Sequence, residues 1–234
     1  MSTLPTAVYV DGYNLYYGRL RGTGYKWLDL VSLFERVLHD QDPSARLERL
    51  RYFSAPALAR FARHGSASVE AQQDYHNALL RQHAPMVSIT LGRHAFNRGG
   101  DLLPRFLENG GFDRNDRVRV WNLEEKQTDV SLAIAMYRDA CSGALGQIVL
   151  CSNDSDAAPA LEAIRQDFPR IVIGIVAPRR PPVPGAREHR STSSALSAHA
   201  HWTRHHLLDS ELEGALLPSI VHTGRKPIRR PAHW

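Results

Sequence analysis

The feature that most constrains the fold is an alternation of short apolar runs with helical patterns over residues 7–178. Apolar or alternating runs predict strands at about residues 8–10, 47–53, 86–91, 147–152 and 171–176. Apolar residues at helical spacing predict helices near residues 29–38, 68–82, 128–137 and 159–168. Strands that alternate with helices predict a parallel sheet with right-handed crossovers. The sequence therefore indicates an α/β fold.

The other segments are less regular. Residues 92–120 contain two Gly-Gly turn signals, and a short extra strand is expected at 118–121. A terminal helix is expected at about 194–208. Because no internal repeat is found, we expect one domain over residues 1–178. Residues 179–234 would then be a C-terminal extension that packs on this domain or trails from it.

The positive charge of the chain lies in this extension. Residues 179–234 hold nine Lys and Arg against four Asp and Glu, which accounts for the whole net charge of +5. A basic extension suits a polyanionic partner such as RNA. No apolar run approaches the roughly 18 residues of a membrane span, and the N-terminus lacks a signal-peptide pattern. We therefore expect a cytoplasmic location with no membrane partner, and a homodimer stays open.

Cysteine and histidine do not predict a metal or redox site. Neither Cys141 nor Cys151 belongs to a C-x-x-C pair, and Cys151 lies within an apolar run typical of a buried strand. Seven of the twelve histidines lie in the last 56 residues, without a Cys or Glu at ligand spacing. These histidines are expected on a solvated surface.

The first strand ends in polar residues that suit a binding site. The apolar run Val8 to Val10 leads directly into Asp11, Gly12, Tyr13 and Asn14. A buried parallel strand would deliver Asp11 to the carboxyl edge of the sheet, where open α/β folds bind their ligands.

Two later segments bring more carboxylates to the same edge. Asp129 follows Lys126 and Thr128 in the first turn of a predicted helix, where the helix dipole alone would also favour an acidic residue. Asp154 and Asp156 follow the predicted strand at 147–152, and capping of the next helix explains only one of them, Asp156.

These carboxylates would converge if the strand order reverses between the first and fourth strands. Two like charges about 4 Å apart repel by roughly 4 kcal/mol at an effective dielectric near 20. Lys126 is the only cation nearby in sequence, so a divalent ion is the simplest source of compensation. Oxygen-only ligation favours Mg²⁺ or Mn²⁺ over Zn²⁺, and these ions commonly act on phosphate esters.

The same residues resemble a known family. The segments 9–15, 125–130 and 152–156 are similar to the three acidic motifs of NYN domains, the LabA-like branch of the PIN-like nuclease superfamily. The resemblance covers about residues 7–178 and departs from the family at Ala157, where an aromatic residue is frequent. It implies a three-layer α/β/α fold with a five-stranded, mainly parallel sheet of order 3-2-1-4-5.

The resemblance also implies a metal-dependent ribonuclease. By motif position, Asp11, Asp129, Asp154 and Asp156 would be both the catalytic carboxylates and the ligands of Mg²⁺ or Mn²⁺. Substrate contacts or support for Asp11 are expected from eight residues: Asn14, Tyr13, Lys126, Thr128, Ser152, Asn153, Ser155 and Arg19. A non-catalytic RNA-binding or regulatory module with the same acidic pocket is the main alternative, and a small-molecule phosphohydrolase is a weaker one.

Overall fold

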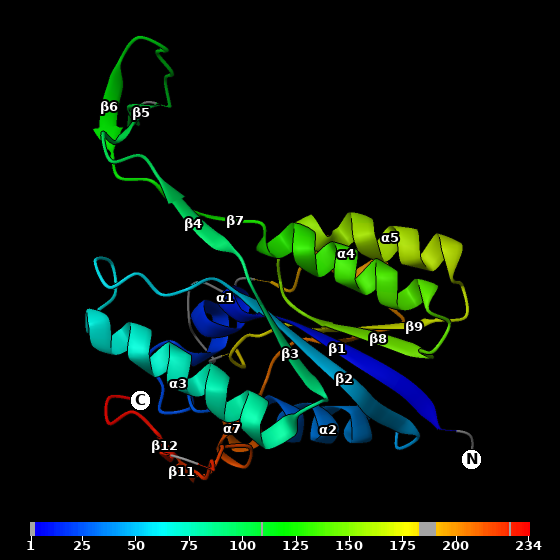
Figure 1. The fold of residues 1–234 in the computed structure, drawn as a ribbon. Coiled ribbons are helices and arrows are strands. Elements are labelled where there is room, and N and C mark those ends of the chain that lie inside the picture. Colours follow the sequence, from blue (N-terminus) through cyan, green and yellow to red (C-terminus); the bar gives the residue numbers. More distant parts are fainter. Residues whose placement is uncertain (1–2, 109, 183–190, 225) are drawn as a thin grey trace.

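A six-stranded parallel sheet forms the centre of the fold in a computed structural model, which describes residues 3–108, 110–182, 191–224 and 226–234. The strand order is β10-β9-β8-β1-β2-β3 (Figure 1). The strands are β1 (Leu4–Asp11), β2 (Ala45–Ser54), β3 (Val87–Leu91), β8 (Gln147–Cys151), β9 (Val172–Val176) and β10 (Trp202–Arg204). This confirms the α/β prediction. The expected order 3-2-1-4-5 corresponds to β3-β2-β1-β8-β9, and β10 adds a sixth strand.

Helices cover both faces of the sheet. They are α1 (Gly12–Leu15), the π-helical η1 (Tyr16–Leu20), α2 (Leu30–Gln41), α3 (Ser66–His83), α4 (Thr128–Cys141) and α5 (Ala158–Asp167). In Figure 1, α2 and α3 lie below the sheet and α4 and α5 above it. Val8 and Val10 of β1 pack with the first pair, and Ala7 and Tyr9 pack with the second. This alternation between two cores fixes the register of β1, because a one-residue slip would exchange the faces.

Gly12 sets how closely α1 follows β1 over β2. A Cβ atom at this position would lie 2.6 Å from the ring and hydroxyl of Tyr52 and 2.7 Å from the carbonyl oxygen of Phe53. No side chain larger than hydrogen fits there unless the backbone moves. The glycine therefore keeps Asp11 close to the end of β2.

We expect Gly12→Ala to lower the free energy of unfolding by about 1–3 kcal/mol, the usual cost of overpacking. Urea unfolding measures this loss. Gly24→Ala is the matched control, since a Cβ there would meet only a side-chain nitrogen of Arg230 at 3.9 Å. Equal stability of the two variants would show that the tight contact at Gly12 is not required.

A two-stranded arm projects from the body between β3 and α4 (Figure 1). It contains the pairs β4 (Arg93–Phe96) with β7 (Leu123–Lys126) and β5 (Asp101–Pro104) with β6 (Arg117–Val120). The extra strand expected at 118–121 is β6, but the arm as a whole was not predicted. At the outer end of the β4–β7 pair, the rings of Phe61, Phe96 and Trp121 lie 5.6–6.1 Å apart.

The helix predicted at residues 194–208 is wrong. The segment forms a short helix, α6 (Ser194–Ser197), followed by β10. Trp202 pairs with Gly174 of β9, where the absence of a side chain leaves room for the indole ring. Sheet pairing and this packing outweigh local helical propensity.

The remaining short elements are α7 (Asp209–Glu213), β11 (Ile220–Val221) and β12 (Ile228–Arg229). The boundary at residue 178 stays a prediction, although β10 joins the central sheet. Cys151 is completely buried in β8, as expected. Among the described residues, no helix has the length and apolar character needed to cross a membrane.

Candidate active site

Asp11 ends β1 at the carboxyl edge of the sheet and caps α1. Its Oδ1 accepts a hydrogen bond from the backbone N–H of Asn14 at 2.9 Å. Its Oδ2 accepts from the Asn14 amide at 2.7 Å and from the Ser152 hydroxyl at 2.9 Å. The residue is only 3% exposed. Asn14 and Ser152 thus hold both carboxylate oxygens of Asp11 in place. Their polar side chains are used to position Asp11.

The loop after β8 lies beside Asp11, as the strand order requires. The Ser152 hydroxyl accepts the backbone N–H of Asp154 at 3.0 Å, so one side chain links the ends of both strands. Asp154 accepts the N–H of Asp156 at 3.1 Å and caps the 3-10 turn η2 (Ser155–Ala157). Asp154, and not Asp156, is therefore the cap. Asp156 lies exposed at this edge.

The third contribution comes from the end of the arm and the start of α4. Asp129 lies in the first turn of α4, a helix that begins directly after Gln127, whose φ of 80° is left-handed. Glu125 of β7 also lies near Asp11 and Asp129, and it is not among the site residues expected from the sequence. Its oxygen Oε1 and the hydroxyl of Thr128 are buried, and the two side chains lie close enough for the Thr128 hydroxyl to favour the charged form of Glu125.

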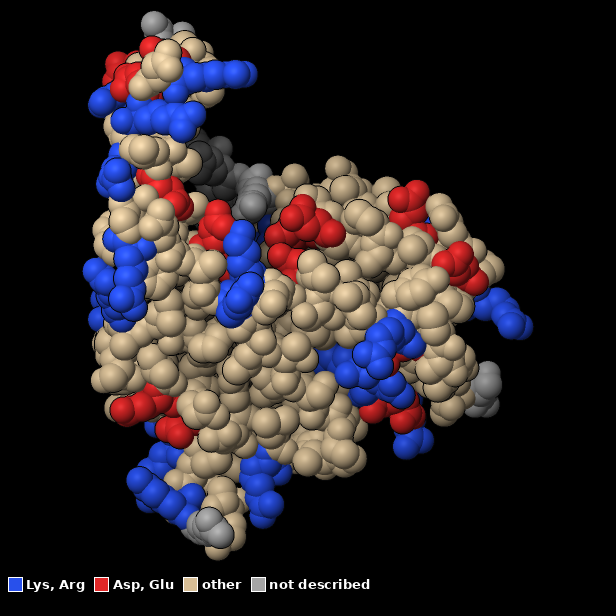
Figure 2. Space-filling view, turned by 45° about the horizontal axis from the view of Figure 1, so that its top comes forward, with Lys and Arg blue, Asp and Glu red and all other residues tan. Residues whose placement is uncertain are grey.

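The carboxylates are close enough to repel one another. Burial raises the pKa of Asp11, and the charge of Asp154 raises it further, against the lowering effect of its hydrogen bonds. Burial and then the charges of Asp11, Asp154 and Asp156 raise the pKa of Asp129. Burial, followed by the charges of Asp11 and Asp129, raises the pKa of Glu125 against the lowering effect of the Thr128 hydroxyl. After burial, the charges of neighbouring carboxylates therefore contribute to all three raised pKa values. Acidic side chains gather where the arm meets the body (Figure 2).

Removing one of these charges should stabilise the fold. Because the pKa of Asp129 is raised on folding, its ionisation costs stability as pH rises through that pKa. Asp129→Asn should therefore raise the urea midpoint at pH 7. The difference should vanish below about pH 4, where aspartate is protonated in both states. Glu70→Gln, an exposed change on α3, is the control. A lower midpoint for Asp129→Asn at pH 7 would contradict the repulsion.

The chemistry of the cluster fits a hard divalent cation. Its donors are carboxylate and hydroxyl oxygens, the ligands that Mg²⁺ and Mn²⁺ prefer. The buried Oε1 of Glu125 and Oγ1 of Thr128 are two further oxygens that a cation or its bound water could contact. In the described part of the chain, no three Asp, Glu, His or Cys side chains are gathered as a finished ligand set. Side-chain rotation would have to complete the site on binding.

Three of the predicted substrate contacts, Tyr13, Lys126 and Asn153, form contacts with other protein residues. The Tyr13 hydroxyl hydrogen-bonds the His94 ring at 2.9 Å and so ties α1 to the arm. Lys126 pairs with Glu124. Asn153 accepts the N–H of Ser193 at 2.8 Å.

Two more predicted substrate contacts differ in their exposure. Ser155 is exposed in η2, which leaves its hydroxyl open to solvent. Arg19 is completely buried, where it donates to the Leu207 carbonyl at 2.8 Å and pairs with Asp209. The burial of Arg19 corrects its expected role, because the guanidinium holds the C-terminal segment and cannot reach a substrate.

Comparison with known proteins places the chain among sequences with these motifs. The family model for the NYN domain matches residues 5–203. A relative from Pseudomonas putida (strain DSM 28022 / S16), 6-hydroxy-3-succinoylpyridine 3-monooxygenase HspA, is 37% identical over 247 aligned positions, which cover 99% of this chain and 75% of the relative. A Vibrio parahaemolyticus RIMD 2210633 protein of unknown function has a similar fold, with a TM-score of 0.50 at 18% identity, over 88% of this chain and 94% of its own.

Proposed function

The chain belongs to the NYN domain family, and on that premise we propose that it is a metal-dependent ribonuclease that hydrolyses RNA phosphodiester bonds. The observation that supports this proposal is that Asp11, Asp129 and Asp154 lie at the carboxyl edge of β1 and β8, where burial and then the charges of neighbouring carboxylates raise the pKa values of Asp11 and Asp129. Such a cluster has the composition of a site that binds a divalent cation and a phosphate together.

Asp11, Asp129, Asp154 and Asp156 would hold Mg²⁺ or Mn²⁺, with Glu125 as an added candidate. When bound, the ion would supply a water of lowered pKa and offset charge on the phosphate. Asn14 and Ser152 keep both oxygens of Asp11 in place. Asp129 is exposed and accepts no hydrogen bond from the described residues, and its raised pKa suits a group that takes a proton from the attacking water.

RNA would lie along the edge between the arm and the body. The exposed rings of Tyr16 and Tyr17 are available for stacking on bases. Basic side chains on the arm beside the acidic edge would contact the backbone (Figure 2). Binding through such contacts should weaken as salt concentration rises.

Cleavage of a labelled RNA with Mg²⁺ or Mn²⁺, and its loss with EDTA, tests the proposal. A catalytic protein should convert the RNA with multiple turnovers. RNA binding that never leads to cleavage with either ion would favour the alternative of a non-catalytic RNA-binding or regulatory module.

The relative from Pseudomonas putida favours a second candidate function. In this alternative the chain inserts one oxygen atom of O₂ into a hydroxypyridine, and the other atom is reduced to water by an external two-electron donor such as NADH. Incubation with 6-hydroxy-3-succinoylpyridine, NADH and ¹⁸O₂ separates the two candidates. One ¹⁸O atom in the product, together with intact RNA in the cleavage assay, would replace the ribonuclease proposal.

A further inference from the structure

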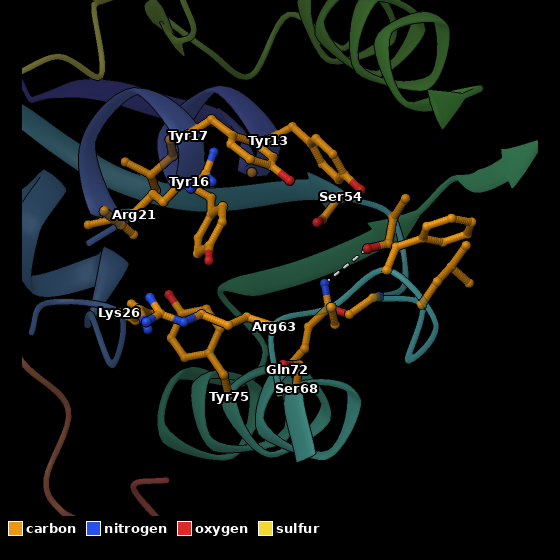
Figure 3. A pocket seen from close by; sticks show the side chains of 18 of the residues that line it. Tyr13, Tyr16, Tyr17, Arg21, Lys26, Ser54, Arg63, Ser68, Gln72 and Tyr75 are labelled. Atoms are coloured by element: carbon orange, nitrogen blue, oxygen red, sulfur yellow. Dashed lines mark hydrogen bonds between the residues drawn. The ribbon is translucent and has the colours of Figure 1, made fainter. Parts of the chain in front are cut away.

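A cavity of about 760 Å³ lies between η1 and α3, beside the acidic edge (Figure 3). Gly12 and Tyr13, which directly follow Asp11, line one end of it. None of the acidic side chains described above takes part in its walls. Its volume falls in the range of about 300–1,000 Å³ that is usual for small-molecule sites. The cavity is therefore a separate compartment that shares α1 with the acidic cluster.

Aromatic rings form much of the wall. In Figure 3, Tyr13, Tyr16 and Tyr17 approach the cavity from α1 and η1, and Tyr75 approaches it from α3. The Trp234 ring also lines it, 5.8 Å from the Tyr75 ring. Tyr16 and Tyr17 are exposed, so these rings are reachable from solvent. Walls of this kind suit a flat ring that can stack.

The charged side chains at the cavity are all positive. Arg21, Lys26 and Arg63 line it, and no Asp or Glu side chain in the described ranges does so. Lys26 Nζ donates to the His233 carbonyl oxygen at 3.5 Å and lies 5.9 Å from the centre of the Trp234 ring. Neither Lys26 nor Arg63 forms an ion pair among the described residues. Burial and then the charge of Arg63 lower the pKa of Lys26. An anionic group on a ligand would relieve this repulsion. The arginines would also offer two parallel donors to a carboxylate or phosphate.

His76 adds a polar group at the floor. It is 4% exposed, lines the cavity, and its Nε2 has no hydrogen-bond partner among the described residues. Burial lowers its pKa to about 4, so the ring is neutral at pH 7. A neutral imidazole nitrogen can donate or accept one hydrogen bond, depending on its tautomer. An unpaired buried nitrogen is unfavourable, and a ligand heteroatom would supply the missing hydrogen bond.

We propose that this cavity binds a planar heteroaromatic ring that carries an anionic group, with the ring between the tyrosines, the anion at Lys26 and Arg63, and a ring heteroatom at His76. Two sources share this chemistry: a nucleotide, free or within an RNA strand, and a free heteroaromatic carboxylate. The inference does not depend on the proposed ribonuclease activity, because it rests on residues outside the acidic cluster.

Titration of the whole protein tests the proposal, with tryptophan fluorescence and calorimetry as readouts. The probes are uridine 5′-monophosphate, pyridine-3-carboxylate, ribose 5-phosphate, which lacks the ring, and uridine, which lacks the anion. At least one of the first two should bind at least tenfold more tightly than both ribose 5-phosphate and uridine. Preference for the nucleotide would identify a nucleotide as the source, and preference for the carboxylate would identify a free aromatic acid.

Variants locate the binding. His76→Leu and the double change Lys26→Ala with Arg63→Ala should each weaken it at least tenfold, whereas the exposed changes His39→Leu and Arg46→Ala should not. If His76→Leu does not fold, the double variant carries the test, since Lys26 and Arg63 are at the surface of the cavity. Asp11→Asn should retain binding even where RNA cleavage is lost. Equal affinity for ribose 5-phosphate, no binding of any probe, or binding unchanged in the Lys26 and Arg63 variant would overturn the proposal.

Discussion

Asp11→Asn is expected to reduce Mg²⁺-dependent RNA cleavage by about 100- to 1,000-fold, a loss typical of removing one preorganised charge from a reaction centre. The carboxylate is buried at the meeting point of β1, β8 and α1, so no other acidic side chain can take its position. Initial rates on a labelled RNA, at saturating Mg²⁺, measure the effect.

A second variant is needed because Asp11→Asn could reduce cleavage by lowering the stability of the fold. Both oxygens accept hydrogen bonds, so an amide nitrogen at either position would face a donor and could lower stability. Asp154→Asn avoids this difficulty, since one amide oxygen can still accept the N–H of Asp156. A comparable loss of cleavage in Asp154→Asn, with an unfolding midpoint no lower than that of the wild type, would assign the effect to the lost charge.

Glu162→Gln on α5 is the matched control, because it removes an exposed carboxylate outside the cluster. It should cleave RNA at the wild-type rate. Full activity in both Asp11→Asn and Asp154→Asn would show that the acidic edge does not carry out the reaction.

The sheet could be predicted because its signal is local. Buried parallel strands need apolar residues on both faces, and β8 and β9 consist almost entirely of such residues. The end of each strand then follows from the first polar residue. This is why the positions of Asp11 and Asp154 at one edge could be expected before the partners of either residue were known.

The arm and the C-terminal segment could not be predicted in the same way. The strands of the arm are four residues long and pair across up to 33 positions, so they leave no clear periodic pattern. Arg19 looked like a free cation in a glycine-rich loop, but its partner Asp209 lies 190 positions away. Glu125 was passed over because only the fold shows that β7 turns its side chain toward Asp11.

Asp139, in the last turn of α4, connects this helix to strands β1 and β2 of the sheet. Its Oδ2 accepts from the Tyr9 hydroxyl and from Arg51 Nε, both at 2.6 Å. Its Oδ1 accepts from Arg51 at 2.9 Å and from Arg49 at 3.0 Å. Burial alone would raise the pKa of Asp139, but the hydrogen bonds from Arg51 and Tyr9 and the charges of both arginines outweigh burial and lower it.

Asp139→Ala should therefore lower the free energy of unfolding at pH 7 by about 2–4 kcal/mol, since it strands the completely buried Tyr9 hydroxyl and leaves two arginines without a counter-charge. Because folding lowers this pKa, the stabilisation is present above the unfolded value near 4 and is lost as pH falls through the folded value. The gap between wild type and variant in urea unfolding should thus shrink below about pH 4.

The half-exposed ion pair of Asp116 with Arg105, on the arm, is the control that shows how much the burial of Asp139 contributes to its effect on stability. Asp116→Ala should cost less than about 1 kcal/mol, as is usual for pairs in contact with solvent. Tyr9→Phe should recover part of the Asp139→Ala loss when the two changes are combined, because no hydroxyl then remains unpaired. If Asp139→Ala costs no more than Asp116→Ala, α4 is held by its apolar contacts alone. The placement of Asp129, at the other end of the same helix, would then not depend on this network.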